Sequence, residues 1–262
     1  TMNNHVPATA CLTIALWGYH TLDGNSATHS RIVSMILGLL LGLAVTIDLP
    51  SGIFVVLLVA GYGTRLSRSN SVCGIVGMCI PVIVHAAVMM SLTGSPLPFQ
   101  LNHDYYMYEE SYWRNPMGVD ALNHSWGLYL FNMTFGRVGI FILYPFLFVG
   151  FMALCAGVFR RDAQVRYWNI GVLGAVCILS IYYVTGTNNY GGVSFGFRWL
   201  IITTPFLVIS ASSNIDQVQS RALKVLVIMF VVVSLVSATQ CRLAPWSVDQ
   251  EWPVRLFGPL VL

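Results

Sequence analysis

One segment of the chain, residues 188–198, combines residue types that could bind an anion. It holds three glycines, three aromatic residues and two asparagines, and it ends in Arg198, directly before an apolar stretch that begins at Trp199. Glycines let a backbone approach a ligand closely, a helix N-terminus favours anions, and the arginine fork matches phosphate oxygens. We therefore expect Arg198 to bind a phosphate or pyrophosphate, with Tyr190 as a neighbouring substrate contact. The alternative is an interfacial arginine that reaches lipid headgroups.

Three carboxylates in the long polar loop 93–137 are candidates for catalysis, namely Asp104, Glu109 and Glu110. A carboxylate in an ordered external loop can act as a general base or hold a metal ion. The sequence contains no Asp-x-Asp motif, so a divalent metal ion is compatible with these residues but is not indicated, and we expect no cofactor. A solvated loop carboxylate is the alternative interpretation for each of the three.

A third polar group stands at the ends of apolar segments. It comprises Asn4 and His5, which follow Asn3 at the start of the chain, and Asp48. Polar residues at helix ends that face one side can line a shared cavity, so we expect them to contact substrate. Capping of a helix N-terminus is the alternative for the asparagines and for Asp48, which precedes Pro50.

The composition indicates which elements must position these residues. The chain has 262 residues, of which 56% are hydrophobic and 9% charged, whereas soluble domains carry about 25% charged residues. We therefore expect an all-α, multi-pass transmembrane protein that forms one polytopic domain over residues 1–262. The sequence contains eight apolar segments, at residues 6–19, 32–47, 51–64, 72–92, 138–159, 167–185, 199–213 and 222–238.

The second and third apolar segments are separated only by Asp48-Leu49-Pro50. Proline disfavours helix at the residue before it and interrupts the backbone hydrogen bonds. We therefore expect two helices that meet at a turn here. One long kinked helix is the alternative, and it would reverse the orientation of the first segment.

Clusters of basic residues predict the orientation in the membrane, because Lys and Arg favour cytoplasmic loops. They lie in three loops that alternate along the chain, at residues 65–68, 160–166 and 221–224. The polar residues near 4, 48 and 188–198 and the loop 93–137 then share the extracytoplasmic side. The net charge of +3 is small and its clusters fit topology signals, so no nucleic-acid partner is expected. The loop 93–137 is rich in tyrosine and tryptophan, and we expect it to be ordered and partly helical.

Several motifs, and the order in which they occur, resemble those of bacterial polytopic proteins similar to the GT-C glycosyltransferases. The resemblance rests on five segments that together span almost the whole chain: Asn3 to Ala8, Gly38 to Pro50, Tyr112 to Pro116, Phe131 to Pro145, and Tyr190 to Pro205. GT-C enzymes are multi-helix membrane proteins that take a sugar from a polyprenyl-phosphate donor on the extracytoplasmic side and use a loop carboxylate as base. The resemblance thus implies a bacterial inner-membrane protein whose partners are membrane lipid and a polyprenyl-phosphate sugar.

The chain departs from that family in the position of its acidic residues. The catalytic Asp of GT-C enzymes usually lies in the first external loop, which would precede Thr1. We therefore expect either that the sequence is a C-terminal portion, which we favour, or that the base is among Asp104, Glu109 and Glu110. In this interpretation Arg198 holds the lipid phosphate, while Asn4 and His5 line the cavity. The alternative is a non-enzymatic multi-pass protein, either a transporter or a subunit of a larger membrane assembly that has other membrane proteins as partners.

Overall fold

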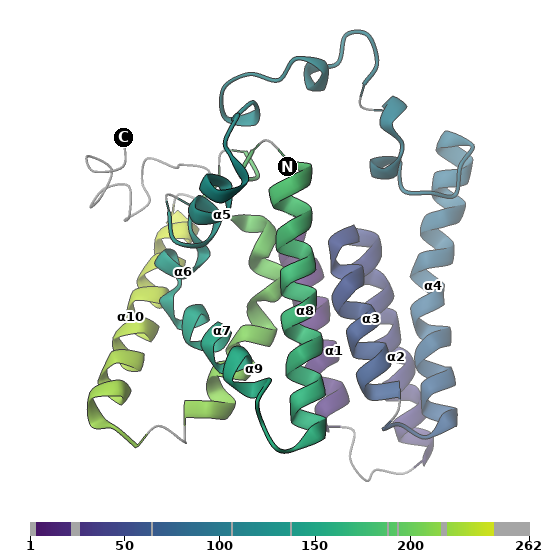
Figure 1. Ribbon diagram of the computed structural model, residues 1–262. Helices are drawn as coiled ribbons and strands as arrows, with labels where there is room; N and C mark the ends of the chain where they lie inside the picture. Colours follow the sequence, from purple (N-terminus) through teal and green to yellow (C-terminus); the bar gives the residue numbers. More distant parts are fainter. Residues whose placement is uncertain are drawn as a thin grey trace. The chain divides into compact units, whose positions relative to one another are not determined.

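The computed structural model describes residues 4–21, 27–63, 65–105, 107–136, 138–187, 189–192, 194–215 and 219–243. Over these residues every regular element is an α-helix or a 3-10 helix (Figure 1). The prediction of an all-α protein is therefore confirmed for the described residues. The chain forms two compact units, at residues Thr1–Met117 and Gly118–Leu262. We describe each unit by itself.

Unit 1 is built from four helices: α1 (His5–Thr21), α2 (Ala27–Ile47), α3 (Gly52–Gly63) and α4 (Arg68–Thr93). Helix α2 lies at the centre and packs against the other three. The core between them is apolar, since Leu12, Leu41, Phe54 and Leu58 are almost fully buried. Ser67 caps α4 by accepting a hydrogen bond from the Asn70 amide, and the left-handed Gly94 ends the helix.

Helices α2 and α4 approach so closely that only glycine fits at their crossing. A Cβ atom on Gly38 would overlap the carbonyl oxygen of Gly74, and one on Gly77 would overlap that of Met35. Small residues permit this kind of backbone contact between apolar helices. The crossing fixes α2, and α2 carries Asp48 at its C-terminal end.

The segment Asp48-Leu49-Pro50 forms the predicted turn between two helices. Helix α2 ends at Ile47, a short 3-10 helix η1 (Leu49–Ser51) follows, and α3 starts at Gly52. Asp48 has extended dihedral angles, so α2 does not continue into η1. The alternative of one long kinked helix is therefore wrong.

The long loop 93–137 is partly helical, as predicted. It contains the 3-10 helices η2 (Phe99–Leu101), η3 (His103–Tyr105), η4 (Tyr112–Arg114) and η5 (Gly118–Asp120), followed by α5 (Trp126–Thr134). The boundary between the two units falls inside this loop. Ser125 starts α5 by accepting a hydrogen bond from the Leu128 amide.

Over its described residues, unit 2 contains α5 and five further α-helices. Two of its apolar segments, predicted as single helices at 138–159 and 199–213, are interrupted. The first divides into α6 (Ile140–Leu143) and α7 (Pro145–Gly157), because Pro145 forces Tyr144 out of helical geometry. The second begins as the 3-10 helix η6 (Arg198–Thr203) and becomes α9 (Thr204–Ile215) just before Pro205. The others are α8 (Ala163–Gly186) and α10 (Arg221–Leu243).

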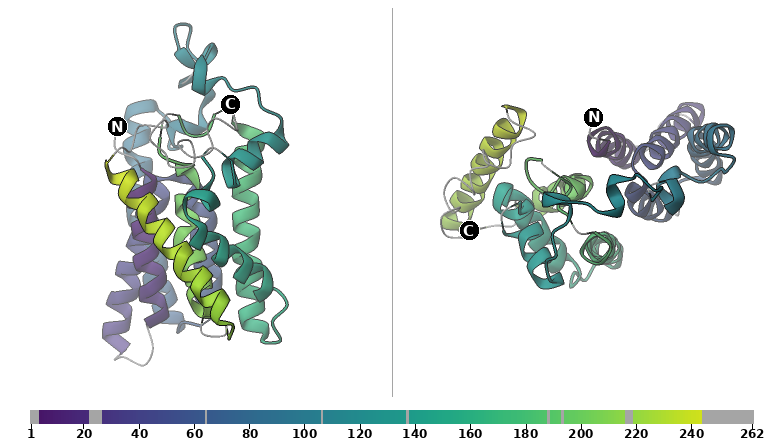
Figure 2. Two further views of the ribbon diagram at one scale, coloured as in Figure 1. Left: turned by 90° about the vertical axis from the view of Figure 1, so that its left-hand side faces the viewer. Right: turned by 90° about the horizontal axis from the view of Figure 1, so that it is seen from above.

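Among the described residues, four helical stretches are long and apolar enough to cross a membrane: Ser30–Ile47, Arg68–Thr93, Ala163–Gly186 and Arg221–Gln240. The apolar stretches Leu49–Gly63 and Pro145–Gly157 are shorter. Helix α10 lies at the edge of unit 2 (Figure 2), beside α6 and α7. Most of its apolar side chains are exposed. Four such helices with uncovered apolar faces are typical of a membrane protein.

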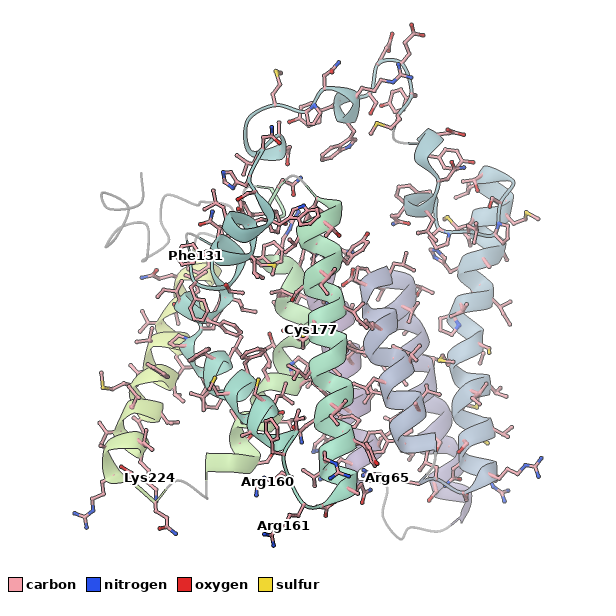
Figure 3. The ribbon with its side chains drawn as sticks, in the orientation of Figure 1. Arg65, Phe131, Arg160, Arg161, Cys177 and Lys224 are labelled. Atoms are coloured by element: carbon pink, nitrogen blue, oxygen red, sulfur yellow. The ribbon has the colours of Figure 1, made fainter. Side chains whose placement is uncertain are left out.

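Three basic residues of unit 2 lie at one end of its helices. Figure 3 shows Arg160, Arg161 and Lys224 at this end, while Phe131 on α5 lies toward the other end. Asp162 caps α8 at the basic end by accepting hydrogen bonds from two backbone amides. The segment after α8, which leads to Arg198, therefore starts at the opposite end of that helix.

Candidate functional site

The candidate site of unit 2 is built around the turn between α8 and η6. We call its described residues, 189–192 and 194–197, the glycine turn. Gly191, Gly192 and Gly196 have positive φ angles of 89°, 73° and 72°, which side chains rarely adopt. The amide of Phe197 donates to the carbonyl of Val138 at 2.9 Å, which ties the end of the turn to the start of α6.

Tyr129 of α5 holds the first part of the glycine turn. Its hydroxyl donates to the Asn189 carbonyl at 2.6 Å and lies 2.7 Å from the Thr187 hydroxyl. Its ring stacks on Tyr190 with the centroids 4.5 Å apart. Burial raises the pKa of Tyr129 to about 12, so the hydroxyl stays protonated and able to donate at neutral pH.

Tyr190 is contacted by two polar side chains that precede and follow the start of α5. Its hydroxyl lies 2.7 Å from His124 Nδ1 and accepts a hydrogen bond from the Asn132 amide nitrogen at 3.1 Å. Burial raises the pKa of Tyr190, and the hydrogen bond from Asn132 opposes this rise. The phenol is thus a neutral member of a hydrogen-bonded chain that runs from Asn132 to His124.

Arg198 follows the glycine turn as the first residue of η6, and its side chain is half-buried. Its Nε atom is buried and makes no hydrogen bond with the described residues. Desolvation lowers the pKa of Arg198, whereas the negative charge of Asp120 in η5 acts in the opposite direction. An N–H group that is removed from water without an acceptor is costly. Arg198 Nε is therefore a donor that an oxygen acceptor would stabilise, and an anionic oxygen would stabilise it most.

Gly191 allows the arginine side chain to lie against the backbone of the turn. A Cβ atom at position 191 would stand 3.2 Å from Arg198 Nε and 3.4 Å from the Trp199 ring. By contrast, a Cβ atom on Gly192 would meet nothing within 4 Å. The first of the two glycines thus leaves room beside Nε, and the second supplies backbone conformation only.

In unit 1 the structure brings together Asn4, His5 and Asp48. His5 Nδ1 lies 2.9 Å from Asp48 Oδ2, and both side chains are buried. The Asn4 amide donates to the Ile47 carbonyl at 3.2 Å. Asp48 stands at the N-cap position of η1 but makes no side-chain capping bond, so the capping alternative is wrong for Asp48. Asn3 lies outside the described residues.

The predicted catalytic carboxylates are not gathered around any cluster. Asp104, Glu109 and Glu110 are exposed side chains in the loop of unit 1. None of their carboxylates makes a hydrogen bond or an ion pair with a described residue. The described residues also contain no group of three or more His, Cys, Asp and Glu side chains that could hold a metal ion.

Four side chains near the glycine turn and Arg198 were not singled out from the sequence as site residues, namely Asp120, His124, Tyr129 and Asn132. Their only local signal is the helix start at Ser125, which places them before and on α5. No periodicity pairs residue 124 with residue 190, since the contact depends on how α5 packs against α8. Asp162 stands at the start of the long helix α8, where capping explains its presence. Asp120 caps no long helix, so its carboxylate could have been singled out as a candidate site residue.

Comparison of the chain with protein-family models, with curated proteins and with solved structures finds no match.

Proposed function

We propose that the chain is a membrane glycosyltransferase, or the membrane portion of one, that transfers a sugar from a polyprenyl-phosphate donor. The observation that carries this proposal is the buried Nε of Arg198, which lacks an acceptor among the described residues. A phosphate oxygen would satisfy it, and a guanidinium that is already partly desolvated binds phosphate strongly. The resemblance of the glycine turn and its flanking segments to GT-C enzymes supports the lipid-linked donor.

In the proposed reaction an acceptor hydroxyl attacks the anomeric carbon of the sugar. A new carbon–oxygen bond forms while the bond between the anomeric carbon and the phosphate oxygen breaks. Polyprenyl phosphate leaves with the bonding electrons, and Arg198 stabilises its negative charge. The proton of the acceptor hydroxyl passes to a general base, a role that carboxylates commonly fill.

The proposed location is the bacterial inner membrane, with several membrane crossings and the glycine turn on the extracytoplasmic side. Two features support it. The four long apolar helices satisfy the length that a membrane span requires. In unit 2, Arg160, Arg161 and Lys224 share one end, as the positive-inside rule expects of cytoplasmic loops (Figure 3).

A second candidate function is a non-enzymatic transporter or a subunit of a membrane assembly. The observation that favours it is the His5–Asp48 pair, because an ionisable pair buried among apolar helices is typical of ion and proton pathways. The two functions differ in whether the donor is consumed. They also differ in which residues matter, Arg198 for the enzyme and His5 with Asp48 for the transporter.

The experiment that tests the enzyme is donor consumption in proteoliposomes. The purified full chain is supplied with a polyprenyl-phosphate hexose or pentose, water serves as the acceptor hydroxyl, and release of polyprenyl phosphate and free sugar is followed by mass spectrometry. We expect release with the wild-type chain and a loss of release of at least about tenfold with Arg198→Ala. The control Arg161→Ala changes an exposed arginine at the basic end, and we expect it to release polyprenyl phosphate as the wild type does. Wild-type release that is unchanged by Arg198→Ala contradicts the assigned role.

A further inference from the structure

His124 has one nitrogen bound to the protein and one that makes no hydrogen bond with the described residues. Its Nδ1 lies 2.7 Å from the Tyr190 hydroxyl, and no other hydrogen bond joins the imidazole to the described residues. The side chain is half-buried, so part of the imidazole is open to its surroundings.

The hydrogen bonds around Tyr190 are compatible with a proton on either imidazole nitrogen of His124. The Asn132 amide donates to the phenol oxygen, so the phenol cannot donate its own proton to that group. In one of the two arrangements the phenol donates its proton to His124 Nδ1. A neutral imidazole that accepts at Nδ1 carries its proton on Nε2. In that arrangement the series of hydrogen bonds from Asn132 through Tyr190 to His124 ends in an N–H donor at Nε2.

The same turn anchors this donor and the arginine. Tyr190 holds His124, and the next residue, Gly191, lies against Arg198 Nε. The imidazole and the guanidinium therefore contact adjacent residues of the glycine turn, which Tyr129 holds through the Asn189 carbonyl.

We infer that His124 is a second ligand-binding residue of this site, and that its Nε2–H donates a hydrogen bond to an oxygen of the lipid phosphate bound by Arg198. The inference rests on the proposed function, which supplies the phosphate. A neutral N–H donor to an anionic oxygen forms a charge-assisted hydrogen bond. This hydrogen bond would orient the phosphate, which the charge of the arginine alone attracts without a preferred orientation. His124 is a binding residue in this proposal, and Tyr190 and Asn132 are positioning residues.

The competing explanation is that His124 only ties the segment before α5 to the glycine turn. The variant His124→Asn separates the two explanations, because the asparagine amide can replace Nδ1 toward Tyr190 but offers no donor at the position of Nε2. A tether predicts that this variant binds ligand as the wild type does. A ligand contact predicts weaker binding in a chain that is folded normally.

Binding is measured with farnesyl phosphate and with farnesol, which lacks the phosphate, on the purified full chain in detergent micelles. We expect His124→Asn to weaken farnesyl phosphate binding by about 5- to 20-fold and to leave farnesol binding unchanged. Tyr190→Phe should weaken farnesyl phosphate binding similarly. This variant keeps the ring stack on Tyr129 but loses the hydroxyl that joins Asn132 to His124. His20→Asn, an exposed histidine of α1, should have no effect.

The tautomer is measured independently of any ligand by nitrogen-15 NMR of histidine-labelled protein, with the His124 signals assigned by their loss in His124→Asn. We expect the Nε2–H tautomer, and an Nδ1–H tautomer overturns the inference. Full binding by His124→Asn, with binding lost in Arg198→Ala, overturns the inference while the proposed function stands. A wild-type chain that binds farnesyl phosphate no tighter than farnesol contradicts the proposed function itself.

Discussion

Gly191 lies against the side chain of Arg198, so that a Cβ atom at position 191 would stand 3.2 Å from Nε. The glycine is needed there for two reasons that can be separated. Its φ angle of 89° is unfavourable for any other residue, and its missing side chain leaves room next to the buried nitrogen.

Gly191→Ala should therefore reduce stability and phosphate binding together. The strained φ angle costs about 1 kcal/mol or more, and the methyl group crowds the position where a phosphate oxygen would meet Nε. The matched variant is Gly192→Ala, which has a similar φ of 73° but no atom within 4 Å of its Cβ. We expect both variants to lose similar stability in denaturant titrations and only Gly191→Ala to lose affinity for farnesyl phosphate. Equal affinities would show that the space beside Nε is unimportant.

The buried His5–Asp48 pair should contribute measurably to the stability of unit 1. His5→Ala leaves the Asp48 carboxylate, which is 3% exposed, without this partner, and we expect a loss of about 1–3 kcal/mol. The nearby Asn4→Ala removes a bond made by an exposed amide and should cost less than about 0.5 kcal/mol. Unfolding in mixed detergent micelles, combined with a double-mutant cycle through Asp48→Ala, measures the coupling. A coupling of zero would contradict the pairing.

The glycine contacts between α2 and α4 should not tolerate a methyl group. Gly38→Ala and Gly77→Ala place a Cβ atom onto a backbone carbonyl of the facing helix, so the helices must separate, at a cost of about 1–3 kcal/mol or more. Gly174→Ala in α8 is the control, because its Cβ would meet nothing within 4 Å, and it should be neutral or slightly stabilising. Unfolding measured by circular dichroism compares the three variants, and equal effects would argue against this helix crossing.

Tyr129 should make the chain less stable at alkaline pH. Its pKa is about 12 in the folded protein against 10.0 for an unperturbed tyrosine, so folding favours the protonated form. The stability that this residue contributes is fully present below pH 10 and is lost as the pH rises toward 12, because the unfolded chain releases its proton first.

Tyr129→Phe tests this dependence, since it keeps the ring stack on Tyr190 but removes the donor to the Asn189 carbonyl. We expect it to cost about 1–2 kcal/mol at pH 8 and progressively less between pH 10 and 12. Denaturant titrations at several pH values give the difference between wild type and variant. A stability difference between wild type and Tyr129→Phe that stays constant from pH 10 to pH 12 would contradict the raised pKa of Tyr129.

The sequence predicted the helices well where one local signal dominates. Pro50 marked the turn between α2 and α3, and the apolar runs marked the positions of α1, α2, α4, α8 and α10. The prediction of single α-helices was wrong for the segments 138–159 and 199–213. In the first, the apolar run conceals the effect of Pro145, which keeps Tyr144 out of helical geometry. In the second, nothing in the apolar run marks the change from 3-10 helix to α-helix at Thr204. The long loop was correctly expected to be partly helical.

The candidate site was only partly predictable. Arg198 and Tyr190 were found because they share a local motif with the glycines, and His5 and Asp48 were both named because each stands at the end of an apolar segment. His124 and Asn132 were missed, since their contacts with Tyr190 span 66 and 58 residues and arise from the packing of α5. The identity of an acidic residue does not show whether its side chain is exposed. From the sequence alone, Asp104, Glu109 and Glu110 could therefore not be distinguished from buried carboxylates.

The central claim is that Arg198 binds the phosphate of a lipid-linked ligand. The most direct measurement is the ratio of the affinities for farnesyl phosphate and farnesol, determined for the wild type, Arg198→Ala and Arg161→Ala. We predict that the wild type and Arg161→Ala prefer the phosphate by at least about tenfold, and that Arg198→Ala binds both compounds as the wild type binds farnesol. A preference for the phosphate that survives in Arg198→Ala would contradict the account.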